Sequence, residues 1–253
     1  MRIREAMYAA YERRLSRRLG PSAVPRHVGV ILDGNRRWAK LSRTDTATGH
    51  RAGAARILDF LGWCEDVGVE VVTLWLLSTD NFARPKPELD ALLTIIDDAV
   101  ASIAAPRRWK VHPVGALDLL PDPLPARLKE YEAATRDVEG LHVNVAIGYG
   151  GRREIADAVR SLLLEAAASG TSIEELAEIL DVEHIAEHLY TRGQPDPELV
   201  IRTSGEQRLS GFLMWQSAHS EFYFCEALWP DFRRTDFLRA LRSYADRERR
   251  FGG

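Results

Sequence analysis

Short runs of β-branched and aromatic residues alternate with longer segments of helical periodicity along most of this chain. The apolar runs predict strands at 27–32, 69–77, 109–115, 141–147, 198–203 and 221–228. Between them, apolar residues at helical spacing predict helices at 50–67, 86–105, 125–138, 152–168, 172–190 and 235–248. The strands are too continuously apolar for a sheet with one face in water, so we expect both faces to be buried.

Strand–helix alternation with connections of this length predicts an α/β fold, with a central, mostly parallel β-sheet flanked by helices. No repeat, low-complexity tract or linker divides the 253 residues, so we expect one domain spanning residues 1–253. In such sheets ligands bind beyond the carboxyl ends of the strands. The segments that follow the strands are therefore the candidates for function.

Composition narrows the class of protein. A 45% apolar share and 28% charged residues are typical of a globular protein and exclude a disordered one. Cys64 and Cys225 lie far apart, which argues for a reducing compartment and against a zinc ribbon. No apolar run approaches the roughly 20 residues of a membrane span. We expect a cytoplasmic protein with no nucleic-acid partner.

Both ends of the chain are locally basic: residues 2–18 contain six Arg and residues 233–250 contain seven. Residues 1–20 predict an amphipathic helix with apolar positions opposite the Arg set. Two interpretations stay open for this helix. It docks against the body of the protein, which we favour, or it associates peripherally with an anionic membrane surface.

The segments that follow the strands are rich in phosphate-binding groups: LDGNRRWAK (32–40), STDNFARP (78–85), GYGGRRE (148–154) and RTSGEQRLS (202–210). Glycines that open a helix expose backbone N–H groups, and arginines donate paired hydrogen bonds to phosphate oxygens. An acid such as Asp33 among them fits Mg²⁺, which usually takes one or two carboxylates together with substrate phosphates. We therefore predict one phosphate-binding rim with two sub-sites.

Rival motifs are weaker. HIAEH (184–188) matches the H-x-x-E-H pattern of zinc peptidases, but it lies in a polar segment without a third ligand. A solvated helix face is the better interpretation of that motif. GYGGRR lacks the G-x-G-x-x-G spacing, and no P-loop sequence occurs, so nucleotide chemistry is not supported.

Five ordered blocks resemble the signature regions of the cis-prenyltransferases, the undecaprenyl diphosphate synthase family: LDGNRRWA, GHRAG, LSTDNFARP, YGGRREI and RTSGEQRLSGFLMWQSAHSEFYF. The resemblance runs from about His27 to the C-terminus. It implies a homodimeric α/β transferase that adds isopentenyl diphosphate to an allylic diphosphate with Z geometry, with Mg²⁺ as cofactor. The pattern is similar to that of actinobacterial short-chain members, which make Z,E-farnesyl diphosphate from geranyl diphosphate. A long-chain synthase for a lipid carrier and a non-catalytic partner subunit of a prenyltransferase remain as alternatives.

The resemblance also implies roles for individual residues. Asp33 matches the aspartate that handles Mg²⁺ and helps the allylic diphosphate leave, and Glu221 matches a second metal carboxylate. Asn81 matches a helper of proton removal; because an amide is a weak base, we interpret its role as positioning. The residues that match allylic-site positions are Gly34, Asn35, Arg36, Arg37, Trp38, His50, Ser78, Thr79, Asp80, Phe82 and Arg84. Those that match the isopentenyl diphosphate pocket are Arg202, Arg208, Leu209 and Ser210, and Arg250 and Gly252 match an R-x-G ending that reaches the partner subunit.

The chain departs from the family pattern at Thr46, where the family usually carries an Arg. Arg43, or Arg36 at a position where many members have Gly, is the candidate replacement. Phe82 and Asp80 stand for the usual Trp and Glu, both mild changes. Leu76 occupies a strand position where long-chain synthases often carry a small residue. A bulky side chain there would fill the space that a growing isoprenoid needs, which favours a short product, with ordinary core packing as the alternative.

Overall fold

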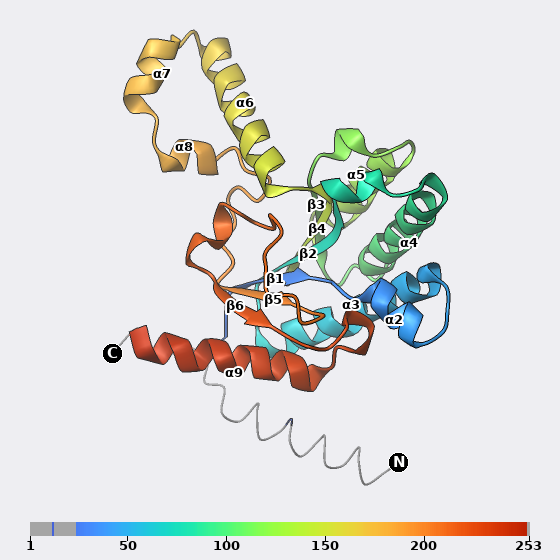
Figure 1. Cartoon of the computed structure of the whole chain (residues 1–253). Coiled ribbons are helices and arrows are strands. Elements are labelled where there is room, and N and C mark those ends of the chain that lie inside the picture. Colours follow the sequence, from blue (N-terminus) through green and yellow to red (C-terminus); the bar gives the residue numbers. More distant parts are fainter. Residues whose placement is uncertain (1–11, 13–23, 252–253) are drawn as a thin grey trace.

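The computed structural model describes residue 12 and residues 24–251, and Figure 1 shows its arrangement. Six strands form one sheet in the order β3-β4-β2-β1-β5-β6, and all five pairings are parallel. The strands are β1 (His27–Ile31), β2 (Val71–Ser78), β3 (Lys110–Val114), β4 (His142–Tyr149), β5 (Leu199–Arg202) and β6 (Glu221–Phe224). The predicted α/β sheet is confirmed, although β6 ends at Phe224 rather than at residue 228.

The helices are α2 (Asn35–Leu41), α3 (Thr46–Val67), α4 (Lys86–Ala104), α5 (Leu124–Thr135), α6 (Gly151–Ser169), α7 (Ile173–Ile179), α8 (Val182–Ala186) and α9 (Arg234–Phe251). Short 3-10 turns occur at η2 (Thr79–Ala83), η3 (Leu117–Leu119), η4 (Gln216–His219) and η5 (Trp229–Asp231). Within the described residues, no helix combines the length and the apolar character that a membrane span requires.

The helices differ from the prediction in two places. The sequence pattern did not predict α2, which has only seven residues. The predicted helix 172–190 is wrong as a single element, because the chain breaks between α7 and α8. There Asp181 adopts an extended backbone and its side chain accepts the N–H of His184, so a new helix starts at this point. Figure 1 shows α6, α7 and α8 extending away from the sheet.

The two faces of the sheet bury different groups, because successive strand residues point to opposite faces. On one face, the strands pack against α3, α4, α5 and α9 in the main core, with Val28, Val30, Val143, Val145 and Ile147 among its members. A smaller apolar cluster on the other face contains Ile31, Ala146, Tyr149, Phe212 and Leu213. Both faces are therefore covered, as the continuous apolar runs predicted.

A row of buried polar side chains crosses the second face near the amino ends of the strands. The carbonyl of Pro195 can only accept, so the Nδ1–H of His27 donates to it, at 2.7 Å. The Nε2 of His27 then accepts from the Thr73 hydroxyl at 2.8 Å, and the Asn144 amide donates to that hydroxyl at 2.9 Å. Burial lowers the pKa of His27 to about 4, so this row holds a neutral histidine.

The connections after β1 and β5 leave the middle of the sheet in opposite directions. β1 and β5 are neighbours, with Ile31 paired to Arg202, but the chain passes from β1 to β2 on one side and from β5 to β6 on the other. In an α/β sheet, such a switch point opens a crevice beyond the carboxyl ends of the strands. Asp33 and Thr203 directly follow these two strands and lie at this crevice.

Candidate active site

A cavity of about 520 Å³ opens at the switch point. Its polar lining comes from the segments after β1, β2 and β5 and from α3: Asp33, Gly34, Asn35, Arg36, Arg37, His50, Ser78, Asp80, Asn81, Arg84, Arg202 and Ser210. Ile31, Leu32, Trp75, Leu76 and Leu92 complete the wall. This lining contains four arginines and two carboxylates, so the cavity favours an anion. Three of the four strand-end segments predicted to form one rim thus meet at this cavity, whereas GYGGRRE (148–154), which follows β4, contributes no lining residue.

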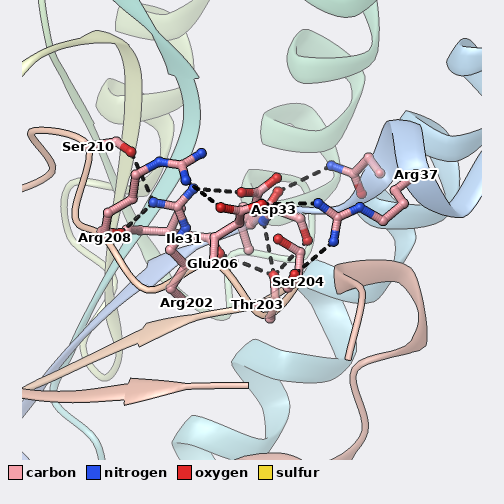
Figure 2. A network of polar contacts seen from close by, with 11 residues as sticks. Ile31, Asp33, Arg37, Arg202, Thr203, Ser204, Glu206, Arg208 and Ser210 are labelled. Carbon is pink, nitrogen blue, oxygen red and sulfur yellow. Dashed lines mark hydrogen bonds and ion pairs between the residues drawn. The ribbon is translucent and has the colours of Figure 1, made fainter. Parts of the chain in front are cut away.

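The main chain of Asp33 is fixed by its neighbours, while its carboxylate faces the cavity. Its N–H donates to the Thr203 hydroxyl at 3.0 Å, and its carbonyl accepts from that hydroxyl at 2.7 Å and from the Trp229 N–H at 3.0 Å. Its carboxylate accepts from Arg202 Nη2 at 2.8 Å, and the Asp33 side chain is 38% exposed (Figure 2). One carboxylate is thus presented to the cavity in a fixed place.

Arg202 joins Asp33 to the loop that follows β5. The residue is only 4% exposed, and its Nη1 donates to the Arg208 carbonyl and, at 2.9 Å, to the Ser210 hydroxyl. Within the described residues its Nε has no hydrogen-bond partner. The Arg208 side chain does not line the cavity; it pairs with Glu206, which also accepts from Arg37. Arg202 therefore contacts the Ser210 side chain and the Arg208 main chain, but the Arg208 guanidinium lies outside the cavity lining where the sequence predicted it.

Two glycine positions explain how α2 enters the site. Gly34 precedes α2 with φ +108°, and a Cβ there would lie 3.1 Å from the main chain of Leu228. Gly49 in α3 faces the start of α2, where a Cβ would come within 2.4 Å of the Asn35 carbonyl oxygen. Only glycine allows this turn and this close helix contact. The GHRAG block therefore permits the packing that places Arg36 and Arg37 at the cavity.

Arg36 and Arg84 share one acid at the cavity wall. Glu88, in the first turn of α4, lies 3.2 Å from Arg84 Nη1 and 3.7 Å from Arg36 Nε. Burial, together with the charge of Arg84, lowers the pKa of neighbouring His50 to about 4. His50 is therefore neutral at pH 7, so it can offer a phosphate a hydrogen bond but no positive charge.

The segment after β2 is held by its own hydrogen bonds. Asn81 Oδ1 accepts the Ser78 N–H at 3.2 Å, and the Ser78 side chain accepts the N–H of Asn81 in return. Because the amide oxygen of Asn81 is engaged, the geometry favours a positioning role for this residue. Thr79 and Phe82 do not line the cavity: Phe82 packs on the main core, and Thr79 lies against Gly150.

Other predicted site residues lie elsewhere. Trp38 is half-buried on α2 but does not line the cavity, and Leu209 packs on the smaller apolar cluster. The described part of the chain leaves out Gly252 and the side chain of Arg250, so the structure does not address the predicted C-terminal contact. The predicted N-terminal helix at 1–20 likewise lies outside the described residues, apart from residue 12.

The predicted pairing of Asp33 and Glu221 around one ion does not occur within one chain. Glu221 begins β6, at the amino end of the sheet, and pairs there with Arg247. Glu221 pairs with Leu199 on the neighbouring strand β5, and Leu199 precedes Arg202 by three residues. Glu221 therefore lies about 10 Å from the level of Arg202, toward the amino ends of the strands. Asp33 follows the carboxyl end of β1. The two carboxylates therefore lie toward opposite ends of the strands, Glu221 at the amino end and Asp33 beyond the carboxyl end.

The HIAEH motif has local partners. His184 pairs with Asp181 at 2.6 Å, and His188 lies 2.9 Å from the Ser161 hydroxyl and 3.4 Å from a Glu165 oxygen. Across the described ranges, no three His, Cys, Asp or Glu side chains form a group that could hold a metal. A zinc site at this helix therefore has no support in the geometry.

A second, smaller cavity of about 40 Å³ adjoins the first. Five residues line both cavities: Leu32, Asn35, His50, Leu76 and Leu92. The remainder of the smaller lining is almost entirely apolar and comes from α3, α4 and η5: Gly53, Ala54, Ile57, Ile95, Ile96, Ala99 and Trp229. The polar cavity thus leads into a small apolar space, and Leu76 is one of the five residues where the two meet. The small space in turn shares Ala54, Ile95 and Ala99 with a further cavity of about 320 Å³ on α3 and α4.

Sequence reasoning missed several residues of the site. Thr203 and Glu206 lie within the RTSGEQRLS segment, but neither was assigned a role. Trp75 and Leu92 line the cavity from a strand and a helix that the sequence identified only as core elements. For Thr203 and Glu206 the available signal was their proximity in sequence to Arg202 and Arg208. For Leu92 no local signal exists, because a cavity wall and a core position share the same helical spacing.

The fold and the site together define an α/β protein with an arginine-rich anion site at a sheet switch point, joined to an apolar space. This geometry fits a substrate with a diphosphate head and a hydrocarbon tail. A family model described as "Putative undecaprenyl diphosphate synthase" matches residues 31–252. The chain belongs to this family, the cis-prenyltransferases, which are prenyl-transferring enzymes.

Known relatives agree with this assignment. The chain is 65% identical over 251 residues to a (2Z,6E)-farnesyl diphosphate synthase from Thermobifida fusca, covering 99% of this chain and 98% of that protein. It is 61% identical over 250 residues to isoprenyl transferase 1 from Streptomyces avermitilis, with 99% and 97% covered. A lavandulyl diphosphate synthase from Lavandula x intermedia, solved in complex with dimethylallyl diphosphate, matches with a TM-score of 0.81 and 32% identity, covering 88% of this chain and 96% of that one. The predicted family and fold are confirmed.

Proposed function

We propose that this protein is a Mg²⁺-dependent transferase that joins isopentenyl diphosphate to geranyl diphosphate with Z geometry and releases (2Z,6E)-farnesyl diphosphate. The main support for a short product is the position of Leu76, which lines both the polar cavity and an adjoining apolar space of about 40 Å³. One water needs roughly 10–15 Å³, so the apolar passage beside Leu76 is narrow for a growing hydrocarbon. The name of the Thermobifida fusca relative supports the same product.

The allylic diphosphate binds at the start of α2. Gly34, Asn35 and Arg37 offer the helix N-terminus and a guanidinium group, and Arg84 adds positive charge from the segment after β2. Arg36 lines the cavity and Arg43 does not. We therefore assign to Arg36 the contact that the family's usual Arg would make at the position of Thr46.

Isopentenyl diphosphate binds beside it, at the loop after β5. Arg202 and Ser210 line the cavity, and Arg208 is tied to them through its own carbonyl, which accepts from Arg202. Asn81 lines the same cavity from the segment after β2 and positions the carbon that loses a proton. The two heads thus bind on neighbouring segments of one rim.

The residues at Asp33 fit Mg²⁺. This ion usually takes one or two carboxylates and completes its shell with water and substrate phosphates, and one half-exposed carboxylate faces a cavity built for phosphate. When bound, Mg²⁺ neutralises charge on the departing diphosphate. Asp33 would hold the ion, and the surrounding arginines stabilise the negative charge that develops on the leaving group. Glu221 of the same chain takes no part.

The other functions fit the site less well. A long-chain synthase needs a wider apolar passage than the space of about 40 Å³ beside Leu76 offers. A non-catalytic partner subunit has no need for the metal aspartate and phosphate arginines, yet Asp33, Arg37 and Arg202 line one cavity here.

The proposal includes a homodimer and takes residues 1–253 as one catalytic domain. The support for the dimer is the lobe of α6, α7 and α8, which extends from the sheet and exposes apolar side chains. Leu164, Ile173, Ile179 and Val182 are 65%, 74%, 57% and 59% exposed. Exposed apolar surface of this kind is typical of an interface. Sedimentation of the full chain tests it, and a monomer at all concentrations would contradict the dimer.

The function is tested by sizing reaction products. The protein is incubated with labelled isopentenyl diphosphate and Mg²⁺, with geranyl or farnesyl diphosphate as the allylic partner, and the products are separated by length. A product of farnesyl length from geranyl diphosphate, abolished by EDTA and restored by Mg²⁺, supports the proposal. A ladder of ten or more units establishes the long-chain function instead, and no product with either partner supports the non-catalytic subunit.

A further inference from the structure

Glu206 lies between two arginines that come from the two proposed diphosphate sub-sites. Its Oε1 accepts from Arg37 Nη2 at 3.1 Å, and its Oε2 accepts from Arg208 Nη1 (Figure 2). Arg37 belongs to α2, which follows β1, whereas Arg208 belongs to the loop that follows β5. One carboxylate therefore links the allylic side of the site to the isopentenyl side.

The main chain under Glu206 is firmly held. Ser204 and Gly205 both have left-handed backbones, with φ of +76° and +74°. The Ser204 N–H donates to the Ala227 carbonyl at 2.8 Å, and the Gly205 N–H donates to the Cys225 carbonyl at 2.9 Å. The turn is therefore anchored to the segment after β6, so Glu206 projects from a rigid support.

The two arginines are much less constrained without this carboxylate. The side chains of Arg37 and Arg208 are 52% and 63% exposed. Arg37 has a further bond, from Nη1 to the Ser204 carbonyl at 2.9 Å. Long exposed side chains lose rotamer freedom when they bind a ligand, at about 0.5–1.5 kcal/mol each, and a partner that holds them in place beforehand removes part of that loss.

We propose that Glu206 is a positioning residue that holds Arg37 and Arg208 ready for the two diphosphates. This inference rests on the function proposed above and adds a residue to which that function assigns no role. The hydrogen bond from Arg37 and the charge of Arg208 lower the pKa of Glu206, so the carboxylate stays ionised at neutral pH. On substrate binding, each guanidinium turns from one carboxylate oxygen to a phosphate oxygen; Arg37 already lines the cavity, and Arg208 swings in from outside its lining.

Electrostatics alone predicts the opposite effect, which makes the inference testable. A carboxylate near two anionic substrates repels them, so its removal should tighten binding if repulsion is its main effect. If Glu206 positions the arginines, its removal weakens binding of both substrates. The sign of the change in KM separates the two.

The test compares initial rates of the full chain with Glu206→Ala, varying each substrate in turn. We expect Glu206→Ala to raise both KM values by about 2- to 12-fold, the range expected for reordering one long side chain per substrate. We expect kcat to change less than either KM. Because both ion pairs are exposed, the melting temperature should stay close to that of the wild type. Glu206→Gln keeps one acceptor and should give an intermediate result.

Two further variants sharpen the result. Glu70→Ala removes an acid from another exposed pair, with Arg26 at 2.9 Å, at the amino end of the sheet, and should leave both KM values unchanged. In an Arg37→Ala background, Glu206→Ala should no longer affect the KM for geranyl diphosphate but should still raise the KM for isopentenyl diphosphate. Equal effects in both backgrounds would overturn the inference.

A fall in either KM, or unchanged KM values in Glu206→Ala, would also overturn it. These outcomes leave the proposed function standing, because that function is judged on the product made by the wild-type protein in the same assay. If the wild type makes no prenyl product, the proposed function itself fails.

Discussion

Asp33 accepts a hydrogen bond of 2.8 Å from Arg202, which lies 169 positions later in the chain. The pair forms because β1 and β5 are parallel neighbours, and each residue stands at or just beyond the end of its strand. Arg202 is almost fully buried and Asp33 is partly exposed, so the arginine supports a carboxylate that still faces the cavity. The proposed metal ligand is therefore held in place before any substrate binds.

Asp33→Asn should remove activity without unfolding the protein. Asparagine can still accept from Arg202, so we expect only a small change in unfolding free energy. Loss of the charge that would hold Mg²⁺ should lower kcat by about 10²–10³-fold, the size seen for the loss of one electrostatic contact to a developing charge. Steady-state kinetics and thermal melting measure the two effects. Activity within threefold of the wild type would contradict a metal role for Asp33.

Leu76→Ala should lengthen the product. The change removes side-chain volume where the polar and apolar cavities meet, so a longer tail can enter between α3 and α4. Product sizing with labelled isopentenyl diphosphate measures the result.

Leu74→Ala is the matched control, because Leu74 lies on the same strand, is fully buried and lines neither cavity. It should cost about 2–5 kcal/mol of stability and leave product length unchanged. If Leu76→Ala gives the wild-type product distribution, Leu76 is ordinary core and does not limit chain length.

Gly49→Ala should displace α2 from α3. A Cβ at this position would lie 2.4 Å from the Asn35 carbonyl oxygen, which belongs to the main chain and cannot turn away. We expect a loss of about 1–3 kcal/mol in unfolding free energy and a raised KM for the allylic diphosphate, since α2 carries Arg36 and Arg37. Urea unfolding and initial rates measure the two effects.

Gly62→Ala is the control on the same helix, where nothing lies within 4 Å of an added Cβ. Alanine there should stabilise the protein by about 0.5–1 kcal/mol, because it lowers the entropy of the unfolded chain. Equal stabilities for the two variants would show that helix contact at Gly49 is unimportant.

Stability should fall as the pH drops from about 6.5 to about 4. The pKa values of His27, His50 and His142 are each lowered to about 4, first of all by burial. An ordinary histidine titrates near 6.5, so between these values the unfolded chain binds protons that the folded protein does not. The contribution of these neutral histidines to the free energy of unfolding is therefore complete above about pH 6.5 and is lost as the pH falls toward about 4. Urea unfolding at a series of pH values measures the slope.

His27→Gln isolates the buried member of this set. An uncharged side chain should flatten part of the slope between pH 6.5 and 4, even if it lowers stability at every pH. A slope identical to that of the wild type would show that His27 is not the group that takes up protons on unfolding.

The strands were predictable because each is a compact apolar run, and burial on both faces of a parallel sheet requires such runs. The helix α2 was not, because its seven residues, which follow a left-handed Gly34, carry too little periodicity. The prediction of a single helix at 172–190 was wrong for a local reason: Asp181 caps a second helix, although the apolar spacing continues through this point.

Glu221 shows where motif resemblance and strand position disagree. The resemblance assigned it to the metal beside Asp33, but the same sequence placed it at the start of a strand. In a parallel sheet all strands start on the same side, so the start of one strand and the end of another lie on opposite sides along the strand direction. The structure accordingly pairs Glu221 with Arg247 instead.

The sequence by itself determined the family, the parallel sheet and the chemical character of the segments that follow the strands, because these depend on local composition and order. Only the tertiary structure decided which of those side chains meet. Strand order, helix packing and rotamers decide that Asp33 meets Arg202 and that Glu206 meets two arginines. They also decide that Leu76 lines both cavities. Those features are set by the whole core at once, so no single segment encodes them.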